Sequence, residues 1–308
     1  MEIVALLLGA LLGAAPQENG GADCQDIVAF QVLLDRSGFS PGEIDGRAGA
    51  NTTRALTAFQ EAKGLPPTGT TDCATRKALG GEPILVDYTI TLDDAAGPFT
   101  ESIPNDLVAQ AQLPALAYQS LLERLGERFH AAPALIEALN RGARFAAGET
   151  IKVPAVEPFA DTAKPAIRQK AAGPLVRVEV SREGSLKVIR DDGSLAMFAP
   201  VTSGSEHDPL PIGQWKVLSV NWMPPFSYNP DLFWDADPSH TKARIKPGPN
   251  NPVGAVWIDI DKEHYGIHGT PEPSKVGHTQ SHGCVRLTNW DAVRLAALVA
   301  PGTPVIFK

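Results

Sequence analysis

The sequence predicts a multidomain protein with a small three-helix module at its N-terminus, an α+β segment in the middle and a mostly-β domain at its C-terminus. Between residues 24 and 80, apolar residues recur at three- and four-residue spacing, which is typical of amphipathic helices. From residue 174 onward, apolar and polar residues alternate in short runs, as in half-buried strands. A chain of 308 residues is also long enough for two or more domains.

The N-terminal module contains two helical stretches separated by a turn-rich connection. Residues 38–46 read Gly-Phe-Ser-Pro-Gly-Glu-Ile-Asp-Gly, and Gly, Pro, Ser and Asp favour turns. Asn51, Thr52 and Thr53 follow as helix-capping residue types and predict the start of the next helix. The apolar stripes of the two stretches are formed by Ile27, Phe30, Leu33 and Leu34, and by Ala55, Leu56, Phe59 and Ala62.

The three cysteines divide into a pair and a single residue. Cys24 and Cys73 lie in the N-terminal quarter, whereas Cys284 lies near the C-terminus. We predict a Cys24–Cys73 disulfide, because a module of three short helices buries little core and gains most from a covalent bond. The bond would close a loop of about fifty residues, worth about 4 kcal/mol in the chain-entropy model. It requires an oxidising compartment, and it leaves Cys284 as a free thiol, either inert or reactive.

The first fifteen residues have features of a signal peptide. The apolar run 3–12 is followed by small residues and is too short to span a bilayer. Met1-Glu2 supplies no positive charge before it, so a buried N-terminal helix is the alternative. We predict a signal peptide at 1–15 and export to the periplasm or cell wall. The net charge of −8 argues against nucleic acid as a partner.

The middle of the chain predicts an α+β segment. Residues 81–115 contain strand-like runs and acidic turns without recognisable chemistry. Within residues 116–155, the pattern predicts a helical stretch, a second helix at 132–139 and a short strand at 151–153. Residues 156–173 are rich in Ala, Pro and Lys without periodicity, which is typical of a linker.

The C-terminal domain, residues 174–308, predicts a β-sandwich with short helices. A helix is expected at 290–299. Residues 221–250 are rich in aromatic residues and Pro, and predict a lid or wall over a cleft; a rigid surface loop is the alternative. Strand-like runs occur at 175–180, 185–189, 214–218, 255–260 and 304–307.

Cys284 has the sequence environment of a nucleophile. A thiol attacks as the thiolate, so it needs a base or positive surroundings. His268 ends a strand-like run sixteen residues earlier, and His282 lies two residues before the cysteine. Gly283 permits a tight turn that aims successive main-chain N–H groups at one point, as an oxyanion hole requires. A Cys-His pair beside such a turn predicts acyl transfer.

A zinc site and an inert structural cysteine are the alternatives for this region. No Cys-x-x-Cys or His-Glu-x-x-His spacing occurs, and Gly283 favours a turn over a ligand-bearing helix. We therefore predict no metal and no other cofactor. The potential ligands that cluster within twenty-one residues are His264, His268, His278, His282 and Cys284.

The region resembles the catalytic signature of the L,D-transpeptidase (YkuD-type) family, over roughly residues 174–308. In some members Ser follows the base-type His; here Gly269 follows His268, so a hydrogen-bonding role of that Ser does not carry over. Pro252-Val253-Gly254 and Asn289-Trp290-Asp291-Ala292 fit the same family. The resemblance rests above all on His268-Gly269-Thr270 and, after a spacer, Ser281-His282-Gly283-Cys284-Val285-Arg286-Leu287-Thr288-Asn289.

This resemblance implies a cysteine-dependent acyltransferase. Cys284 would attack a tetrapeptide stem, release D-alanine and pass the acyl group to an amine of a second stem, giving a 3→3 cross-link. His268 is the expected base, and His282, Gly283 and Cys284 are expected to form the oxyanion turn. Arg286 is expected to anchor a substrate carboxylate, with an internal salt bridge as the alternative. The remaining residues assigned to the substrate-binding loop are Ser281, Gly269 and Asn289, with Ser281 and Asn289 bracing it.

Two upstream segments resemble wall-binding modules. Residues 24–80 resemble the three-helix peptidoglycan-binding domain, on the basis of the runs 30–34, 38–46, 53–60 and 64–69. Residues 116–155 resemble a LysM carbohydrate-binding repeat, on the basis of Leu121, Leu125, Phe129, Leu135, Leu139, Asn140, Gly148 and Val153-Pro154. A structural spacer is the alternative for that segment.

The expected partners are peptidoglycan stem peptides and glycan strands, with carbapenem-type β-lactams as covalent inhibitors. The acyl acceptor stays open: water would make the protein an L,D-carboxypeptidase or cross-link hydrolase, and a protein lysine would make it a lipoprotein-anchoring transpeptidase. A wall-binding protein with a degenerate catalytic domain is a further alternative, against which the presence of both His268 and Cys284 argues. The oligomeric state is also open.

Overall fold

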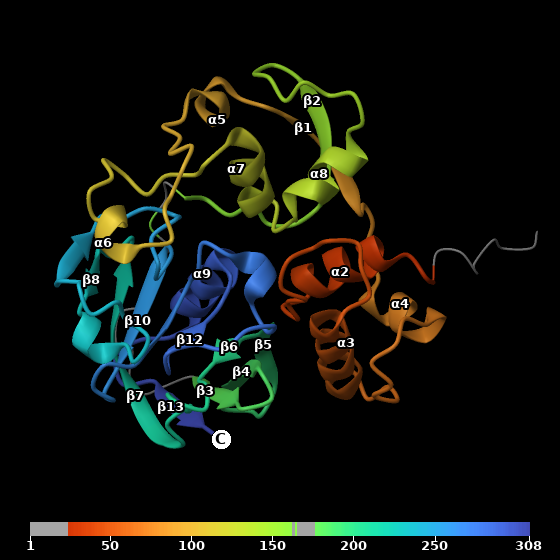
Figure 1. Cartoon of the computed structure of the whole chain (residues 1–308). Coiled ribbons are helices and arrows are strands. Elements are labelled where there is room, and N and C mark those ends of the chain that lie inside the picture. Colours follow the sequence, from red (N-terminus) through yellow and green to blue (C-terminus); the bar gives the residue numbers. More distant parts are fainter. Residues whose placement is uncertain (1–23, 162–163, 165–175) are drawn as a thin grey trace, which may run out of the picture.

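The computed structural model describes residues 24–161, 164 and 176–308. The predicted signal peptide and most of the predicted linker lie outside the described residues. Figure 1 shows a helical N-terminal module, a mixed α+β module above it and a strand-rich C-terminal domain beside both. Within the described ranges, no helix is long and apolar enough to cross a membrane.

The N-terminal module has the three predicted helices, α2 (Ile27–Arg36), α3 (Ala50–Ala62) and α4 (Cys73–Leu79). Asp26 caps α2 by accepting a hydrogen bond from the main-chain N–H of Ala29. The predicted cap of α3 at 51–53 is wrong, because α3 begins at Ala50 with Gly49 as its N-cap. The Asn51 side chain instead donates to the carbonyl of Val276 at 2.8 Å.

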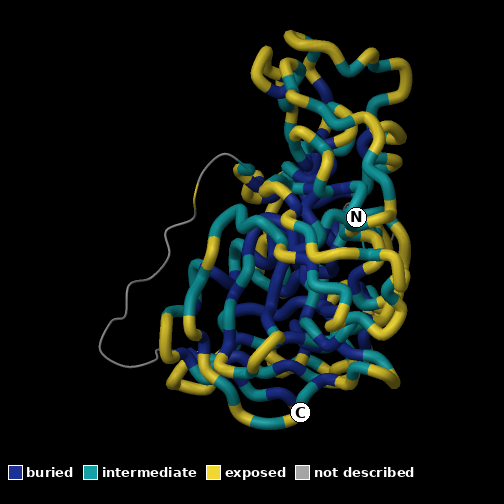
Figure 2. Tube along the Cα trace, turned by 60° about the vertical axis from the view of Figure 1, so that its left-hand side comes forward, coloured by how far each residue is buried: buried dark blue, intermediate teal, exposed yellow. Residues whose placement is uncertain are grey.

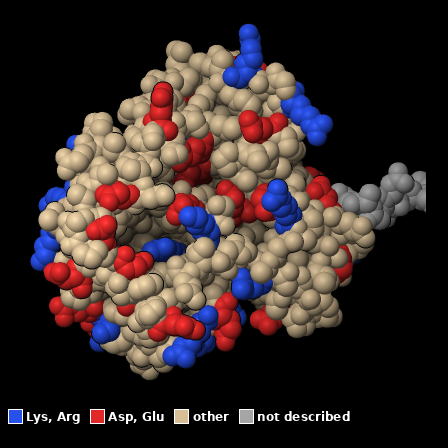
Figure 3. Space-filling model, in the orientation of Figure 1, with Lys and Arg blue, Asp and Glu red and all other residues tan. Residues whose placement is uncertain are grey.

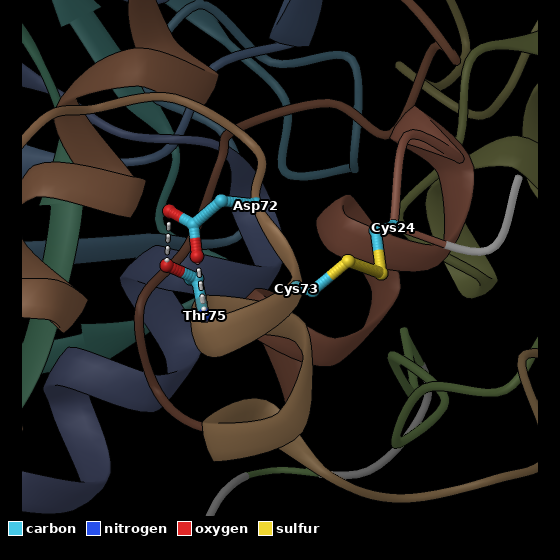
Figure 4. Close-up of a disulfide and its surroundings, with 4 residues drawn as sticks. All are labelled: Cys24, Asp72, Cys73 and Thr75. Atoms are coloured by element: carbon cyan, nitrogen blue, oxygen red, sulfur yellow. Dashed lines mark hydrogen bonds between the residues drawn. A yellow bond between two sulfur atoms is a disulfide. The ribbon is translucent and has the colours of Figure 1, made fainter. Parts of the chain in front are cut away.

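The predicted disulfide is present and connects the chain before α2 to the first residue of α4 (Figure 4). The Cα atoms of Cys24 and Cys73 lie 4.9 Å apart, and Cys284 is free. Asp72, next to the bond, accepts from the main-chain N–H of Thr75 at 2.7 Å and from its hydroxyl at 2.9 Å. A covalent bond and a helix cap therefore act together at the start of α4.

The middle module is larger than the sequence indicated. Strand β2 (Thr150–Pro154) pairs antiparallel with β1 (Leu85–Thr89), so the module begins well before residue 116. Strand β1 lies within the strand-like runs expected at 81–115, and its pairing partner is 61 residues away, as for the Thr89–Thr150 pair. Between the strands lie α5 (Leu92–Ala96), α6 (Leu107–Gln110), α7 (Leu121–Arg128) and α8 (Pro133–Leu139).

The C-terminal domain is built on one nine-stranded sheet in the order β5-β4-β3-β13-β7-β10-β11-β12-β6. Its long strand β7 (Gly213–Trp222) pairs with β13 (Pro304–Phe307) through its first half and with β10 (Val256–Ile260) through its second half. The mostly-β character predicted for this domain is confirmed, and β7 joins the strands on its two sides into one sheet. The remaining strands of this sheet are β3 (Val176–Ser181), β4 (Ser185–Arg190), β5 (Leu195–Pro200), β6 (Thr202–Ser203), β11 (Gly266–His268) and β12 (Val285–Arg286).

Smaller elements complete this domain. Helix α9 (Asn289–Leu298) matches the predicted helix and packs its buried side on the sheet. The hairpin β8 (Phe226–Tyr228) and β9 (Ala243–Ile245) lies within the aromatic 221–250 segment. The 3-10 turns η1 (Pro230–Leu232) and η2 (Pro273–Lys275) lie in loops on the same domain.

Each module completes its hydrophobic core with residues of another. Phe198 of β5 packs into the core of the N-terminal module, and Val32 and Ile44 of that module pack into the core of the middle module. Phe159 packs on Trp290, so the predicted linker is buried where it begins. Figure 2 shows the buried trace continuing from the C-terminal domain into the modules above it. The three modules therefore form one packed body.

Replacing both disulfide cysteines should destabilise this body. In the double variant Cys24→Ser/Cys73→Ser, we expect the free energy of unfolding to fall by about 4 kcal/mol, because the unfolded chain regains the entropy of a loop of about fifty residues. Urea denaturation measures the change. Cys284→Ser is the matched control and should unfold as the wild type does; an unchanged midpoint in the double variant would contradict the expectation.

Candidate active site

Cys284 and His268 lie at the neighbouring strands β12 and β11, close to the β6 edge of the sheet. Strands β11 and β12 run parallel, with Ile267 opposite Val285 and His268 opposite Arg286. Ile267 and Val285 are fully buried in the core. Since side chains alternate between the two faces of a sheet, Cys284, Arg286 and His268 project from the opposite face. The register therefore brings together three residues that are separated by up to eighteen positions in sequence.

His268 is a neutral imidazole with a defined tautomer. Its Nδ1 lies 2.6 Å from the carbonyl oxygen of Gly269, which can only accept, so Nδ1 carries the proton and Nε2 is left with a free lone pair. Burial, together with the positive charge of Arg286, lowers the pKa of His268 to about 3. The ring also stacks on Trp257, with centroids 5.4 Å apart. His268 is thus oriented as a proton acceptor.

Cys284 is held as a thiol. Its Sγ donates to the carbonyl oxygen of His264 at 3.8 Å. Burial raises the pKa of the thiol, while a hydrogen bond from the Gly266 main chain and the charge of Arg286 act to lower it. The free protein therefore carries a thiol beside a neutral imidazole, and the proton has to move when substrate is bound.

Arg286 supplies positive charge between these two groups. Its pKa is lowered by burial, which the charge of Cys284 opposes. Its Nε is buried without a hydrogen-bond partner, and no ion pair joins it to another residue in the described part of the chain. The charge of Glu272 nevertheless acts on Arg286 and raises its pKa, so an internal charge pair stays an alternative. Figure 3 shows a hollow on the C-terminal domain with basic atoms at its floor and acidic side chains around it.

The turn before Cys284 requires glycine and is tied down by Ser281. Gly283 has φ +95°, and a Cβ there would lie 2.5 Å from Cε1 of Tyr265. The Ser281 hydroxyl donates to the Cys284 carbonyl at 2.7 Å and accepts from the Gly204 N–H at 2.7 Å. Ser281 is buried, and both of these hydrogen bonds join it to the protein.

Asn289 is buried directly behind His268. Its Oδ1 accepts from the Ala255 N–H at 2.9 Å, and the residue is 0% exposed. A Cβ at Gly269 would lie 2.2 Å from this Oδ1, and one at Gly254 would lie 2.1 Å from it. Asn289 therefore fills the space that a Ser side chain at position 269 would need.

The comparisons with known proteins agree with this geometry. Residues 175–307 match the family model of the L,D-transpeptidase catalytic domain, named YkuD. The chain carries an L,D-transpeptidase catalytic domain. Residues 25–79 match the model of a putative peptidoglycan binding domain, as the sequence predicted.

Similar proteins carry related names. The putative L,D-transpeptidase YkuD of Bacillus licheniformis is 48% identical over 60 residues, which are 20% of this chain and 36% of that protein. The putative L,D-transpeptidase YqjB of Bacillus subtilis is 31% identical over 131 residues, 41% of this chain and 66% of that protein. The chain thus spans about a third of the first relative. Among solved structures, L,D-transpeptidase 3 from Mycobacterium tuberculosis has a TM-score of 0.37 at 18% identity, over 53% of this chain and 75% of that one.

The aromatic 221–250 segment of the L,D-transpeptidase domain lies against His282. The His282 Nε2 is 2.8 Å from the Asp235 carboxylate, and the Phe233 ring lies 4.9 Å from the imidazole. Trp234 is exposed and stacks on His207. These contacts agree with a wall beside the catalytic loop. Sequence reasoning missed Asp235, because 47 residues separate it from His282 and no motif marks it.

The remaining histidines of the L,D-transpeptidase domain have separate surroundings. His278 lies 3.4 Å from the Asn51 amide, and His264 lies near Glu263. Over the described ranges, no group of three or more His, Cys, Asp and Glu side chains is arranged to hold a metal ion.

Removing the Arg286 charge should shift the reactivity of Cys284 to higher pH. Because that charge lowers the pKa of the thiol, Arg286→Met should raise this pKa, so that alkylation by iodoacetamide needs more alkaline conditions. Intact-mass measurement of alkylation against pH gives the apparent value. Arg190→Met, on the exposed end of β4, is the control and should leave the profile in place. A profile that shifts to lower pH in Arg286→Met would contradict the expectation that the Arg286 charge lowers the pKa of the Cys284 thiol.

Proposed function

We propose that the protein is an exported peptidoglycan L,D-transpeptidase. Cys284 takes up the acyl group of a tetrapeptide stem with release of the terminal D-alanine, and an amine of a second stem then receives it to give a 3→3 cross-link. The observation that carries this proposal is that Cys284, His268 and Arg286 project from one face of β11 and β12 within the matched domain.

The first half-reaction forms a thioester. The Sγ–H proton of Cys284 moves to Nε2 of His268 as the sulfur attacks the carbonyl carbon of the third stem residue. The proton then passes to the amine of the leaving D-alanine as the C–N bond breaks. In the second half-reaction, the acceptor amine loses its proton to His268 and attacks the thioester. The C–S bond breaks, and the leaving Cys284 sulfur takes the proton back from His268, which restores the thiol and the neutral imidazole.

Arg286 and the Gly283 turn have distinct roles in this scheme. The half-buried guanidinium of Arg286, whose Nε has no hydrogen-bond partner in the described part of the chain, suits a bidentate contact with a stem carboxylate. Such pairing would offset the charge that lowers the pKa of His268, so bound substrate would make the base stronger. The main-chain N–H groups of His282, Gly283 and Cys284 would stabilise the oxyanion, where loss of one donor costs about 2.7–4 kcal/mol.

Wall attachment is assigned to the upstream modules. A cavity of about 450 Å³ lies where the N-terminal and middle modules meet the loop after His268. Its polar wall includes Glu43, Asp45 and Arg47 of the N-terminal module, and Leu135 contributes apolar surface from the middle module. We assign peptidoglycan contact to this surface, and the Cys24–Cys73 disulfide supports export to an oxidising compartment.

Acylation by a carbapenem tests the nucleophile and base. Wild-type protein should gain one covalent adduct by intact mass, and Cys284→Ala should gain none. His268→Ala should slow acylation about 10²- to 10⁴-fold, the contribution that a positioned general base makes. Correctly folded wild-type protein that remains unmodified would contradict the assignment of Cys284, and wild-type rates in His268→Ala would remove that residue from the base role.

Purified tetrapeptide muropeptides test the acceptor. We expect mass spectrometry to find cross-linked dimers together with free D-alanine, because the thioester is intercepted by an amine. Cys284→Ala serves as the control and should leave the substrate intact. Tripeptide and D-alanine without dimers would identify water as the acceptor and would make the protein an L,D-carboxypeptidase.

A further inference from the structure

Helix α9, which follows the Cys284 loop directly, is held by side chains of both upstream modules. From the N-terminal module, Ser40 donates to Asp291 at 2.6 Å and Asp35 pairs with Arg294 at 2.6 Å. From the middle module, His130 stacks on Trp290 with centroids 5.0 Å apart and planes at 8°. Figure 1 shows α9 on the side of the catalytic domain that faces α2 and α7. The end of the catalytic motif is therefore part of the module junction.

The first residue of α9 connects this junction to the active site. The Asn289 Nδ2 donates to both carboxyl oxygens of Glu127, at 3.3 and 3.4 Å, and to the Pro249 carbonyl at 3.2 Å. The other end of the amide fills the space beside Gly269, whose carbonyl accepts the Nδ1 proton of His268 at 2.6 Å. A shift of the amide would therefore move the group that orients the imidazole.

We propose that Glu127, a residue of the middle module, is a positioning residue for acyl transfer, which holds Asn289 and through it the Gly269 carbonyl that orients His268. The proposal rests on the proposed function for its kinetic consequence. Glu127 is buried and lies on α7, outside the catalytic domain. It does not touch the reacting atoms, so its effect is on the orientation of the base alone.

The protonation state of Glu127 matters to this role. Burial, helped by the negative charges of Glu123, Glu43 and Asp161, raises its pKa to about 8, and the Asn289 hydrogen bond opposes this shift. Burial raises the pKa of Tyr118, and the charge of the ionised Glu127 carboxylate raises it as well. Near neutral pH Glu127 is therefore a neutral carboxyl that accepts from Asn289. Its ionisation at higher pH would leave a buried charge without a cation.

The same shift has a consequence for folding stability. The folded protein keeps the Glu127 proton up to a pH of about 8, whereas the unfolded chain releases it near the ordinary value of 4.5. Between those values the folded state binds more protons, so stability falls as pH rises. Glu127→Gln removes this dependence and retains the shape and the acceptor oxygen.

The test measures the rate at which a carbapenem acylates the full-length protein, using stopped-flow absorbance over a range of pH. Wild type is compared with Glu127→Gln, Glu127→Ala and Glu123→Gln. Ionisation of Cys284 changes the acylation rates of wild type and Glu127→Gln alike, so the ratio of the two rates is independent of it. It should stay flat near neutral pH and then fall about tenfold or more above pH 8, since small misplacements of a catalytic group cost up to about 10²-fold. Glu127→Ala should be slower at neutral pH, while Glu127→Gln retains the wild-type rate there.

Glu123→Gln is the matched control, because Glu123 lies one turn earlier on α7 and contacts Asn250 across the same junction without touching Asn289. It should keep the wild-type rate at neutral pH and still show the fall, which should begin at a lower pH because the charge of Glu123 no longer raises the pKa of Glu127. A second readout needs no acylation: the downfield proton resonance of His268 Nδ1 should be present in wild type and Glu127→Gln and lost in Glu127→Ala.

A wild-type rate at neutral pH in Glu127→Ala, or a His268 resonance unchanged in that variant, would overturn the positioning role. A flat ratio would overturn its dependence on the Glu127 proton. Failure of wild-type protein to react with the carbapenem would count against the proposed function instead, and the His268 resonance would still decide the role of Glu127.

Discussion

The buried amide of Asn289 is the contact on which the geometry around His268 depends. Its oxygen faces the main-chain N–H of Ala255 and occupies the volume left open by Gly254 and Gly269. Because both glycines lack a Cβ, the amide can approach the backbone that carries the imidazole. An amide has a donor and an acceptor end, so its orientation is set by partners on both sides. The catalytic strand end is thus specified by packing as much as by hydrogen bonding.

Main-chain hydrogen bonds and hydrophobic contacts between the modules show that they are not independent units. The connection 38–46 of the N-terminal module bonds to β5 on one side, where Ser40 N–H donates to the Phe198 carbonyl at 2.9 Å. On the other side, Ile44 N–H donates to the His130 carbonyl at 2.8 Å. Hydrophobic side chains cross both boundaries as well. An inter-module interface of this kind behaves as an interior, where removing one partner leaves a cavity or an unpaired polar group.

Much of the fold could be predicted from local patterns, and the remainder depends on contacts distant in sequence. Helices α2, α3 and α9 and strands β3, β4, β7, β10 and β13 follow the 3.6- and two-residue periods of their apolar residues. The Cys284 loop was also evident, because its motif is contiguous. The Glu127 contact joins residues 162 positions apart, and nothing near Glu127 in sequence marks it. Phe159, surrounded by Ala and Pro, likewise gave no periodic signal, although it is buried on Trp290.

The shared cores also determine how far the nucleophile can reach. A catalytic domain joined to its binding module by a flexible linker could reach any stem within the length of that linker. Its effective concentration at any one stem would depend on the linker length. In this chain the N-terminal module and Cys284 belong to one packed body, so the distance between them is fixed. Under the proposed function, the protein would select stem peptides by their distance from the glycan strand that its upstream modules bind. Cross-links would then form only between stems at that distance.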